Sequence, residues 1–581
     1  MAPRRRAAIA ARAAVTLRPG VPALTQRERV AWLALLFAAI AAGGALRGYQ
    51  LAIQIILDDE WHALHKLLAS GAWGIFTSFG YSDYSIPLTL YDRLLFLHGG
   101  LSEWAMHLPM LLSGITLLVA APLLLRRETT LPVRATWVAL LAISPLLVYH
   151  SRIARPYALT SLLTLLALVA FRRWWLRQGS ALGWGATYAI ATAVAAWLHL
   201  VTLPFTLLPF AYCGVPALVA LARDRRLATH ASAALGRLSL LGLATALPLA
   251  AALLPPLVND WADVTSKVAA DTVTLESVYR TLLMLYGVAQ PAPLVALAAL
   301  TGLGIARFWR RDREFVRYLA VVTLGAAIAI PLARSPWIHE PLVLGRYLIP
   351  ALCLMLLFLA EGIVACLAFF RPPALRPLVV AALVASLVWL GPIPSYFYYP
   401  NQFMGHLRFQ FDYDPAHNPY VLFAPKEPVP EFYRMLAHQP PGTITLIEAP
   451  WRLESHFDPY PWYQEIHRQY VKIGFVTPVC GKRDFGEYPA SATGLRMREF
   501  AHLSGVLAGE SYGADYLVMH LAPWTTPPGQ EIEWPDVAAC LPAIEAKLGA
   551  PVYRDAQIVV FALEPRRTAS AHLDDASTMD R

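Results

Sequence analysis

The chain has 581 residues, of which 57% are hydrophobic and only 15% are charged. A soluble protein is about 25% charged, so this composition excludes a soluble, disordered or fibrous chain and indicates a polytopic membrane protein. Forty-eight Lys and Arg against 39 Asp and Glu give a formal net charge of +9. This excess does not require nucleic acid, because membrane proteins concentrate Lys and Arg in their cytoplasmic loops.

Eleven apolar segments of roughly the length needed to cross a bilayer follow one another along the chain. They are 30–50, 104–125, 133–149, 157–172, 182–198, 200–222, 235–256, 291–308, 316–333, 343–369 and 376–393. The fifth and sixth meet at His199 with almost no loop and need a tight hairpin. We therefore predict about eleven transmembrane helices, and totals from nine to thirteen are compatible with the pattern.

The loop charges give a separate test of this topology. With the N-terminus in the cytoplasm, the inside segments carry 24 Lys and Arg and the outside loops carry 8. This asymmetry satisfies the positive-inside rule and favours an odd number of spans. Residues 1–29 then form a basic cytoplasmic N-terminus, and the first span is a retained signal anchor because no small-residue cleavage site follows it.

The transmembrane domain is predicted at 30–394, and two regions of the chain do not cross the membrane. The first is the outer loop 54–103, in which 61–73 and 88–98 suit helices lying in the interface plane. The second is 395–581, which contains no span and which an odd span count places outside. Strand-like runs at 443–448, 470–476, 515–521 and 557–562, with helical patterns at 430–438 and 537–548, predict an α/β domain there.

The five cysteines agree with this division. Cys213, Cys353 and Cys366 fall within spans and are expected to be packing residues. Cys480 and Cys540 fall in the outer domain, where the compartment permits a disulfide between them or two free thiols.

An acidic triplet, Asp58-Asp59-Glu60, follows the first span directly. One interpretation is a solvated loop start that caps the next helix, since acids favour helix N-termini. A second is a metal site, because Asp58 or Asp59 lies at helical spacing from His62, with His65 one turn further on. In the same loop, Asp83 occupies a polar and aromatic turn, whereas Asp92 beside Arg93 is expected to be a solvated pair.

Arginines and histidines occur in the other outer loops. The segment 150–157 holds Arg155 and Tyr157 together with a second arginine, Arg152, and arginine suits either phosphate contacts or lipid headgroups. Arg346-Tyr347 is predicted to open the tenth span, where an arginine opposes the helix dipole and should have an anionic partner. All these groups, with His199 at its hairpin, are expected at one membrane face, where they could bind a lipid phosphate and provide a carboxylate base.

The order of these motifs resembles the GT-C superfamily of polyprenyl-phosphate-sugar-dependent glycosyltransferases. The likeness is greatest to the dolichyl-phosphate-mannose protein mannosyltransferase-like family, which includes the bacterial transferases that place aminoarabinose on lipid A. The matching features, over about 30–370, are Asp59-Glu60 after the first span, two surface helices in the first outer loop, Ser151, Arg155 and Tyr157 in the 150–157 loop, and Arg346, Tyr347 and Pro350 before a late span.

Two features depart from the family pattern. Many members have Lys-Pro-Pro in the first outer loop, where this chain has Tyr84-Ser85-Ile86-Pro87 and no lysine. The lysine that the family pattern would offer to the donor phosphate from this loop is therefore missing. The second acid of the loop is represented by Asp83, the best candidate at that place. The region 395–581 carries no family signal.

The resemblance implies transfer of a single sugar from a polyprenyl phosphate to a hydroxyl of a glycan, lipid or protein, with inversion. The implied catalytic residues are Asp59 as general base with Glu60 and Asp83, and the implied phosphate contacts are Arg155, Arg346, Tyr157 and Tyr347. Asp58, His62 and His199 are accessory candidates. A divalent cation, Mg²⁺ or Mn²⁺ held by Asp58 and Asp59, is left open because the family is not uniform in its metal requirement.

The implied location is a bacterial inner membrane with the outer domain in the periplasm. Three alternatives remain open. The chain could be a non-catalytic membrane anchor for the outer domain, a lipid or sugar transporter, or a ligase that transfers an assembled oligosaccharide. A transporter is expected to carry charged residues or broken helices near mid-membrane, and the apolar segments here contain few acids.

Overall fold

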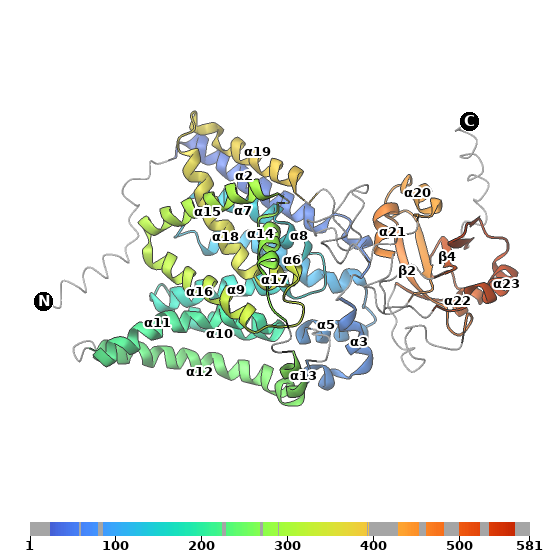
Figure 1. Ribbon diagram of the computed structural model, residues 1–581, viewed down its shortest axis with the longest axis horizontal. Coiled ribbons are helices and arrows are strands. Elements are labelled where there is room, and N and C mark those ends of the chain that lie inside the picture. The colour runs from blue at the N-terminus through green and yellow to red at the C-terminus, as the bar shows by residue number, and fades with distance from the viewer. Residues whose placement is uncertain are drawn as a thin grey trace.

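The fold was obtained as a computed structural model. It describes residues 24–56, 60–79, 85–223, 228–267, 271–288, 290–391, 393, 428–451, 460–481, 499–522 and 534–563. Most of these residues form a bundle of long helices, and a smaller α/β domain lies beyond one end of that bundle (Figure 1).

The bundle is built from the apolar segments expected from the sequence. Within the described residues, nine helices are long and apolar enough to cross a membrane, and two further apolar helices, Leu131–Ile143 and Pro373–Trp389, are shorter. The bundle helices are α2 (Gln26–Gly48), α6 (Glu103–Leu124), α7 (Leu131–Ile143), α9 (Tyr157–Trp175), α10 (Ala181–Leu198), α11 (Leu203–Arg223), α12 (Ala228–Asn259), α15 (Pro291–Arg311), α16 (Arg313–Leu332), α18 (Ile349–Leu367) and α19 (Arg376–Leu390). The protein is therefore an integral membrane protein whose helices follow the predicted order.

Small residues allow α15 and α18 to pack closely. A Cβ atom added at Gly304 would lie 1.8 Å from the carbonyl oxygen of Phe358, and one added at Gly362 would lie 1.9 Å from that of Leu300. Helices in lipid associate largely through such close backbone approach, because lipid tails are as apolar as the side chains.

Ion pairs connect several helix ends at the end of the bundle away from the α/β domain. Arg172 at the end of α9 lies 2.8 Å from Glu128 and 2.9 Å from Asp312, which precedes α16. Arg311 at the end of α15 lies 3.3 Å from Glu361 of α18. The loops after α6, α9 and α15 therefore share one end, as the predicted alternation requires.

Short helices cover the opposite end. They are η1 (Leu51–Ile53), α3 (Trp61–Ala69), α4 (Ala72–Phe76), α5 (Ile86–Leu97), α8 (Pro145–Tyr149), α13 (Trp261–Ser266), α14 (Leu275–Tyr286) and α17 (Pro341–Tyr347). Two of them, α3 and α5, lie at the end of the bundle that faces the α/β domain (Figure 1). They correspond to the two surface helices predicted for the first loop, whereas α14 and α17 were not predicted.

The α/β domain contains one sheet of six strands. They are β1 (Thr445–Ala449), β2 (Tyr470–Phe475), β3 (Phe500–His502), β4 (Tyr516–His520), β5 (Tyr553–Arg554) and β6 (Ile558–Ala562), in the order β3-β2-β1-β4-β6-β5. The first four strands run parallel, and β6 is antiparallel to both of its neighbours. The four predicted strands are present, and the short β3 and β5 were missed.

Helices on both sides bury the two faces of this sheet. They are α20 (Glu431–Ala437), α21 (Tyr460–His467), α22 (Leu503–Leu507) and α23 (Val537–Leu548). Because side chains alternate along a strand, Leu446 and Val518 belong to the core shared with α20, α21 and the bundle, whereas Ile447 and Leu517 pack with α22 and α23. A disulfide joins Cys480, which follows β2, to Cys540 of α23.

Candidate functional site

The acidic triplet follows η1 in the sequence, and Glu60 is the member that the structure describes. Glu60 is 1% exposed, and its Oε1 atom lies 2.8 Å from Nε2 of His107 on α6. The same oxygen accepts a hydrogen bond from the backbone N–H of Ala154. Asp58 and Asp59, with Asp83 of the same loop, lie outside the described residues. Glu60 is therefore enclosed and held in place, which excludes a solvated loop start for this residue.

The backbone immediately before the triplet is also held in place. The N–H of Ile56 donates to Oε1 of Glu103, the first residue of α6, at 3.0 Å. The Gln54 side chain exchanges two hydrogen bonds with Arg152, through the Arg152 carbonyl at 2.9 Å and its guanidinium at 3.1 Å. Residues on both sides of the undescribed pair, Asp58 and Asp59, are thus fixed by the same elements of the bundle.

Asp92 of α5 is a second buried carboxylate beside Glu60. It is 2% exposed, and burial raises the pKa of its carboxyl group well above the ordinary value, with a smaller contribution from the negative charge of Glu60. The prediction of a solvated Asp92–Arg93 pair is wrong, because Arg93 instead donates to the backbone carbonyl of Ser70 at 3.1 Å.

Aromatic and imidazole rings from three separate stretches of sequence form a continuous group, here called the ring cluster, which consists of His150, Tyr157, His199 and Tyr347. The centroid of the Tyr157 ring lies 4.7 Å from that of His150 and 5.5 Å from that of His199. The His199 ring in turn lies 5.3 Å from that of Tyr347. The structure therefore brings together three residues that the sequence analysis singled out in separate loops.

The guanidinium of Arg346 adjoins the ring cluster. It lies 5.5 Å from the centroid of the Tyr157 ring and 5.6 Å from that of Tyr347, within the range of a cation–π contact. The prediction that Arg346 opens a span is wrong, since Arg346 is in the last turn of α17 and α18 begins at Ile349. A cation at a helix carboxyl end is favourable, so the dipole argument for an anionic partner does not apply.

The two arginines of the 150–157 loop differ in their surroundings. Arg152 donates to the carbonyls of Arg47 at 3.1 Å and Tyr49 at 2.7 Å, at the end of α2. Its guanidinium thus satisfies carbonyls that the helix leaves without intrahelical partners. Arg155 is 5% exposed and follows Ala154, the residue that contacts Glu60.

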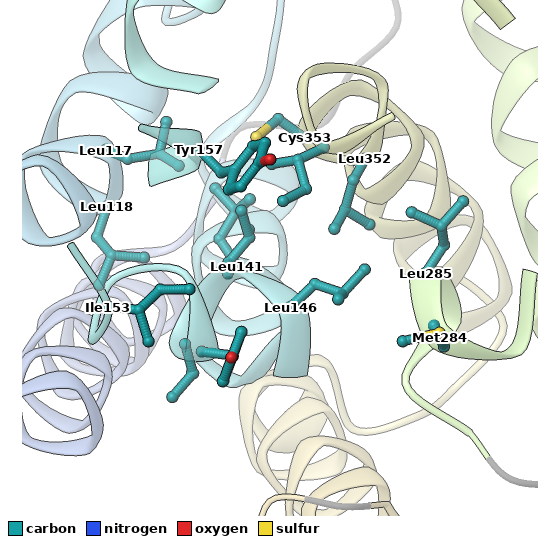
Figure 2. Close-up of a cluster of buried hydrophobic side chains, with 14 of the residues drawn as sticks. Leu117, Leu118, Leu141, Leu146, Ile153, Tyr157, Met284, Leu285, Leu352 and Cys353 are labelled. Atoms are coloured by element: carbon teal, nitrogen blue, oxygen red, sulfur yellow. The ribbon is translucent and has the colours of Figure 1, made fainter. Parts of the chain in front are cut away.

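Tyr157 connects the ring cluster with the hydrophobic interior. Figure 2 shows its ring in one buried cluster that draws side chains from several elements, among them Ile153, Leu117, Leu118, Leu352 and Cys353. Tyr157 is 1% exposed, and among the described residues its hydroxyl has no hydrogen-bond partner. A packed ring with an unsatisfied buried hydroxyl is suited to contact an acidic ligand group.

Sequence reasoning missed His107, which is fully buried against Glu60. The sequence did contain a signal for His107. Glu103 and His107 are four residues apart at the start of an apolar helix, so their side chains share one face of that helix. His62 lies half-buried on α3. Among the described residues, no group of three His, Cys, Asp or Glu side chains is arranged to hold a metal ion.

The site therefore has two parts that are joined by one loop. Glu60 and Asp92 supply carboxylates, and Arg346 with the ring cluster supplies a cation and donor groups. The loop 150–157 contacts Glu60 through Ala154 and enters the ring cluster through His150 and Tyr157. Such a site can hold a negatively charged group beside a carboxylate that accepts a proton.

No family model matches the chain, and no curated protein matches it. Among solved structures, the chain is similar to that of ArnT from Cupriavidus metallidurans in the apo state, with a TM-score of 0.42 and 15% identity over 92% of this chain and 98% of that chain. The structure of ArnT bound to undecaprenyl phosphate gives a TM-score of 0.41 at 14% identity, over 92% of this chain and 97% of that one.

The chain is also similar to the archaeal oligosaccharyltransferase AglB from Archaeoglobus fulgidus, solved with an inhibitory peptide and a dolichol-phosphate. The TM-score is 0.40 and the identity is 14%, over 86% of this chain and 70% of that one. Similarity at this level assigns no role to any residue of this chain.

Proposed function

We propose that the protein is a membrane glycosyltransferase that moves one monosaccharide from a polyprenyl-phosphate donor to an acceptor hydroxyl. The acceptor belongs to a glycan, lipid or protein of the cell envelope, and the reaction occurs at the periplasmic face of a bacterial inner membrane. The proposal combines the motif resemblance with the geometry of the site. It names Asp59 as the general base and Arg155, Arg346, Tyr157 and Tyr347 as contacts to the donor phosphate.

The observation that carries the proposal is the connection made by the 150–157 loop. The loop contacts Glu60 through the N–H of Ala154. Three residues later, Tyr157 lies against the Arg346 guanidinium and His199. A simple membrane anchor gives no reason for one loop to join a buried carboxylate to an arginine and its neighbouring rings. Transfer from a sugar phosphate requires a carboxylate base and a cation no further apart than the length of one substrate. The reason is that the attacking hydroxyl and the leaving phosphate lie on opposite sides of the same carbon.

The mechanism follows from this arrangement. The acceptor oxygen attacks the anomeric carbon, its proton passes to Asp59, and the bond from that carbon to the phosphate oxygen breaks with inversion. The departing phosphate gains negative charge, which Arg346 and Arg155 stabilise by hydrogen bonds and which the Tyr157 hydroxyl can also contact. Glu60, fixed by Ala154 and His107, maintains the course of the chain beside Asp59.

A divalent cation does not enter these steps. The described side chains do not fit an ion by themselves, because they contain no group of three suitable ligands, and Oε1 of Glu60 already accepts from Ala154. An ion, if the enzyme uses one, would have to be held mainly by Asp58 and Asp59. A metal requirement is tested by measuring sugar transfer after chelation and again after Mg²⁺ or Mn²⁺ is added back.

The proposal is tested by comparing the masses of envelope glycolipids and lipopolysaccharide from cells with and without the protein. A missing monosaccharide in the deletion strain would identify both the sugar and the class of acceptor. Asp59→Asn should reproduce the deletion, since loss of a general base lowers transfer by about 10²–10⁴-fold. Asp58→Asn should have a smaller effect, because Asp58 lies outside the motif pair.

The possible results separate the alternatives. Identical profiles with and without the protein would contradict a transferase and favour a membrane anchor. Loss of the sugar in the deletion strain but not in Asp59→Asn would favour a transporter or a different base. If Asp58→Asn is inactive and Asp59→Asn is active, the base is Asp58. Loss of a whole oligosaccharide instead of a single sugar would indicate a block-transferring ligase.

A further inference from the structure

The α/β domain contacts the bundle at the segment that leads to the acidic triplet. On α21, Gln464 is 8% exposed, and its Oε1 atom accepts a hydrogen bond from the N–H of Ile55 at 3.0 Å. Its Nε2 atom donates to the carbonyl of Ile53 and, at 3.2 Å, to that of Gln469. A single amide side chain therefore satisfies a donor and an acceptor of the backbone at 53–55.

This contact completes the restraint of residues 53–56. Ile55 and Ile56 are fully buried. The bundle holds the Gln54 side chain through Arg152 and the N–H of Ile56 through Glu103. The α/β domain holds Ile53 and Ile55 through Gln464, and Gly442 of that domain also approaches Ile53, with 3.3 Å between an added Cβ and the Ile53 side chain.

The consequence concerns the position of the base. From Ile55 to Asp59 the chain runs only four residues, and the next residue, Glu60, is fixed by Ala154 and His107. A backbone N–H that is buried without a partner is destabilising, so the segment would rearrange if Gln464 were removed. Displacement of a catalytic group by about 1 Å can lower a rate by about 10²-fold.

We infer that Gln464 is a positioning residue, through which the α/β domain fixes the backbone of residues 53–55, four residues before the proposed base Asp59. The inference rests on the proposed function for its effect on catalysis, but not for its effect on the backbone. It predicts that the enzyme is fully active only when the α/β domain is docked on residues 53–55.

The chain offers a matched control in Gln469, a second buried glutamine that is five residues away. Its Oε1 atom accepts from the N–H groups of Thr443 and Ile444, both at 3.0 Å, inside the α/β domain. Its Nε2 atom donates to the carbonyls of Leu436 and Pro440 in the same domain, and within the described part of the chain its side chain has no hydrogen bond to residues 53–56. Gln469→Ala should therefore weaken the domain without releasing the segment.

The experiment measures two quantities on the full-length protein in lipid nanodiscs. Amide hydrogen exchange of the peptide that covers residues 51–56 should become at least about tenfold faster in Gln464→Ala and remain unchanged in Gln469→Ala. The kcat for transfer should fall by about 10–100-fold in Gln464→Ala with an unchanged donor KM. Gln464→Glu keeps the acceptor for the N–H of Ile55 but loses the donor to the carbonyl of Ile53. Relative to Gln464→Ala, it should restore part of the exchange protection at 51–56 and part of the kcat.

Unchanged exchange at 51–56 in Gln464→Ala would overturn the inference, even if the protein proved to have no transferase activity. An equal fall of kcat in Gln464→Ala and Gln469→Ala would also overturn it, because the cause would then be general weakening of the domain. If the wild-type protein transfers no sugar while exchange rises only in Gln464→Ala, the proposed function fails and the positioning contact stands.

Discussion

At the scale of single residues, the candidate site is defined by polar groups buried in pairs. Glu60 and Asp92 are each at most 2% exposed, although isolated carboxylates are almost never fully buried. Glu60 has specific partners, whereas the carboxyl group of Asp92 has a strongly raised pKa, which favours its neutral form. These two buried carboxyl groups are therefore held differently, Glu60 by hydrogen bonds and Asp92 by burial that favours its neutral form.

From the sequence it was easier to identify the residues of the candidate site than to predict what each of them contacts. The motif positions Glu60, Tyr157, Arg346 and Tyr347 were found from the order of short motifs at the outer ends of the spans, which resembles that of a known family. The surroundings of Arg152 and Asp92 were not predictable, because they depend on where the end of α2 and the face of α5 lie after packing. Asp59 and Asp83 stay predictions from the sequence.

Tyr157→Phe should separate ligand binding from stability. The change removes a buried hydroxyl that has no partner among the described residues, so thermal stability should be equal or higher. If that hydroxyl contacts the donor phosphate, the donor KM should rise by about tenfold or more, the effect of one charge-assisted hydrogen bond. The measurements are thermal unfolding and steady-state kinetics in nanodiscs.

Tyr188→Phe is the matched control for this test. The Tyr188 hydroxyl is buried within the bundle and donates to the carbonyl of Thr206. Its removal should lower stability by about 1 kcal/mol and leave the donor KM unchanged. A wild-type KM in Tyr157→Phe would exclude the hydroxyl from donor binding.

Asp92→Asn should change the dependence of stability on pH. A carboxyl group whose folded pKa is raised imposes no penalty below its unfolded pKa of about 3.9, and the fold loses stability as pH rises above that value. Asparagine does not ionise, so the substitution removes this loss of stability at higher pH. The melting temperature of the variant should therefore approach that of the wild type near pH 4 and exceed it by about 2 °C or more at pH 8.

Asp263→Asn serves as the control, because Asp263 is exposed on α13. Its melting temperature should follow that of the wild type at every pH, as is usual for surface substitutions. If Asp92→Asn is instead less stable than the wild type at pH 8, ionised Asp92 must have a stabilising partner.

At the scale of helices and strands, hydrophobic periodicity was a good guide wherever an element is long. The apolar helices, α5, α23 and strands β1, β2, β4 and β6 were all expected from the sequence. The missed elements are short or amphipathic. Examples are β3, which has three residues, and α17, which reads as the beginning of the following span. Their place is determined by tertiary packing, which a local pattern does not contain.

The disulfide should stabilise the α/β domain without affecting transfer. Cys480 and Cys540 are 60 residues apart, and closing a loop of this length is worth about 4 kcal/mol in the chain-entropy model. Peptide-resolved thiol labelling should detect neither cysteine before reduction. Cys540→Ser should lower the stability of the domain and retain transfer, whereas Cys366→Ser, at an exposed cysteine, should alter neither property. Labelling of both Cys480 and Cys540 without reductant would contradict the bond.

At the scale of the whole molecule, the fold brings distant stretches of chain to one end of the bundle. The loop after α2, the loop before α9, the hairpin at His199 and the end of α17 meet in the site. The α/β domain contacts the same end through Gln464. The sequence predicted a common face from loop charges alone, but the docking of this domain on residues 53–55 required the structure.

A reporter fused after residue 581 tests this arrangement. An odd number of spans with a cytoplasmic N-terminus places the reporter in the periplasm, on the same side as the loop 54–103. A second reporter in the loop after α6, where Arg126 and Arg127 lie, should be cytoplasmic. A cytoplasmic signal after residue 581 would break the assignment, because Glu60 and the α/β domain would then be on the wrong side for a periplasmic reaction.

The central claim is that Arg346 and the ring cluster hold the donor phosphate beside a separate carboxylate base. It is tested most directly by titrating the protein in nanodiscs with a polyprenyl phosphate that carries no sugar. The wild type should bind, and Arg346→Ala should bind at least about tenfold more weakly. Arg346→Lys should recover only part of the lost affinity, because lysine keeps the charge but lacks the bidentate geometry of arginine. Asp59→Asn and the remote Arg317→Ala should match the wild type. Equal affinity of Arg346→Ala and the wild type, or no binding by the wild type, would contradict the account.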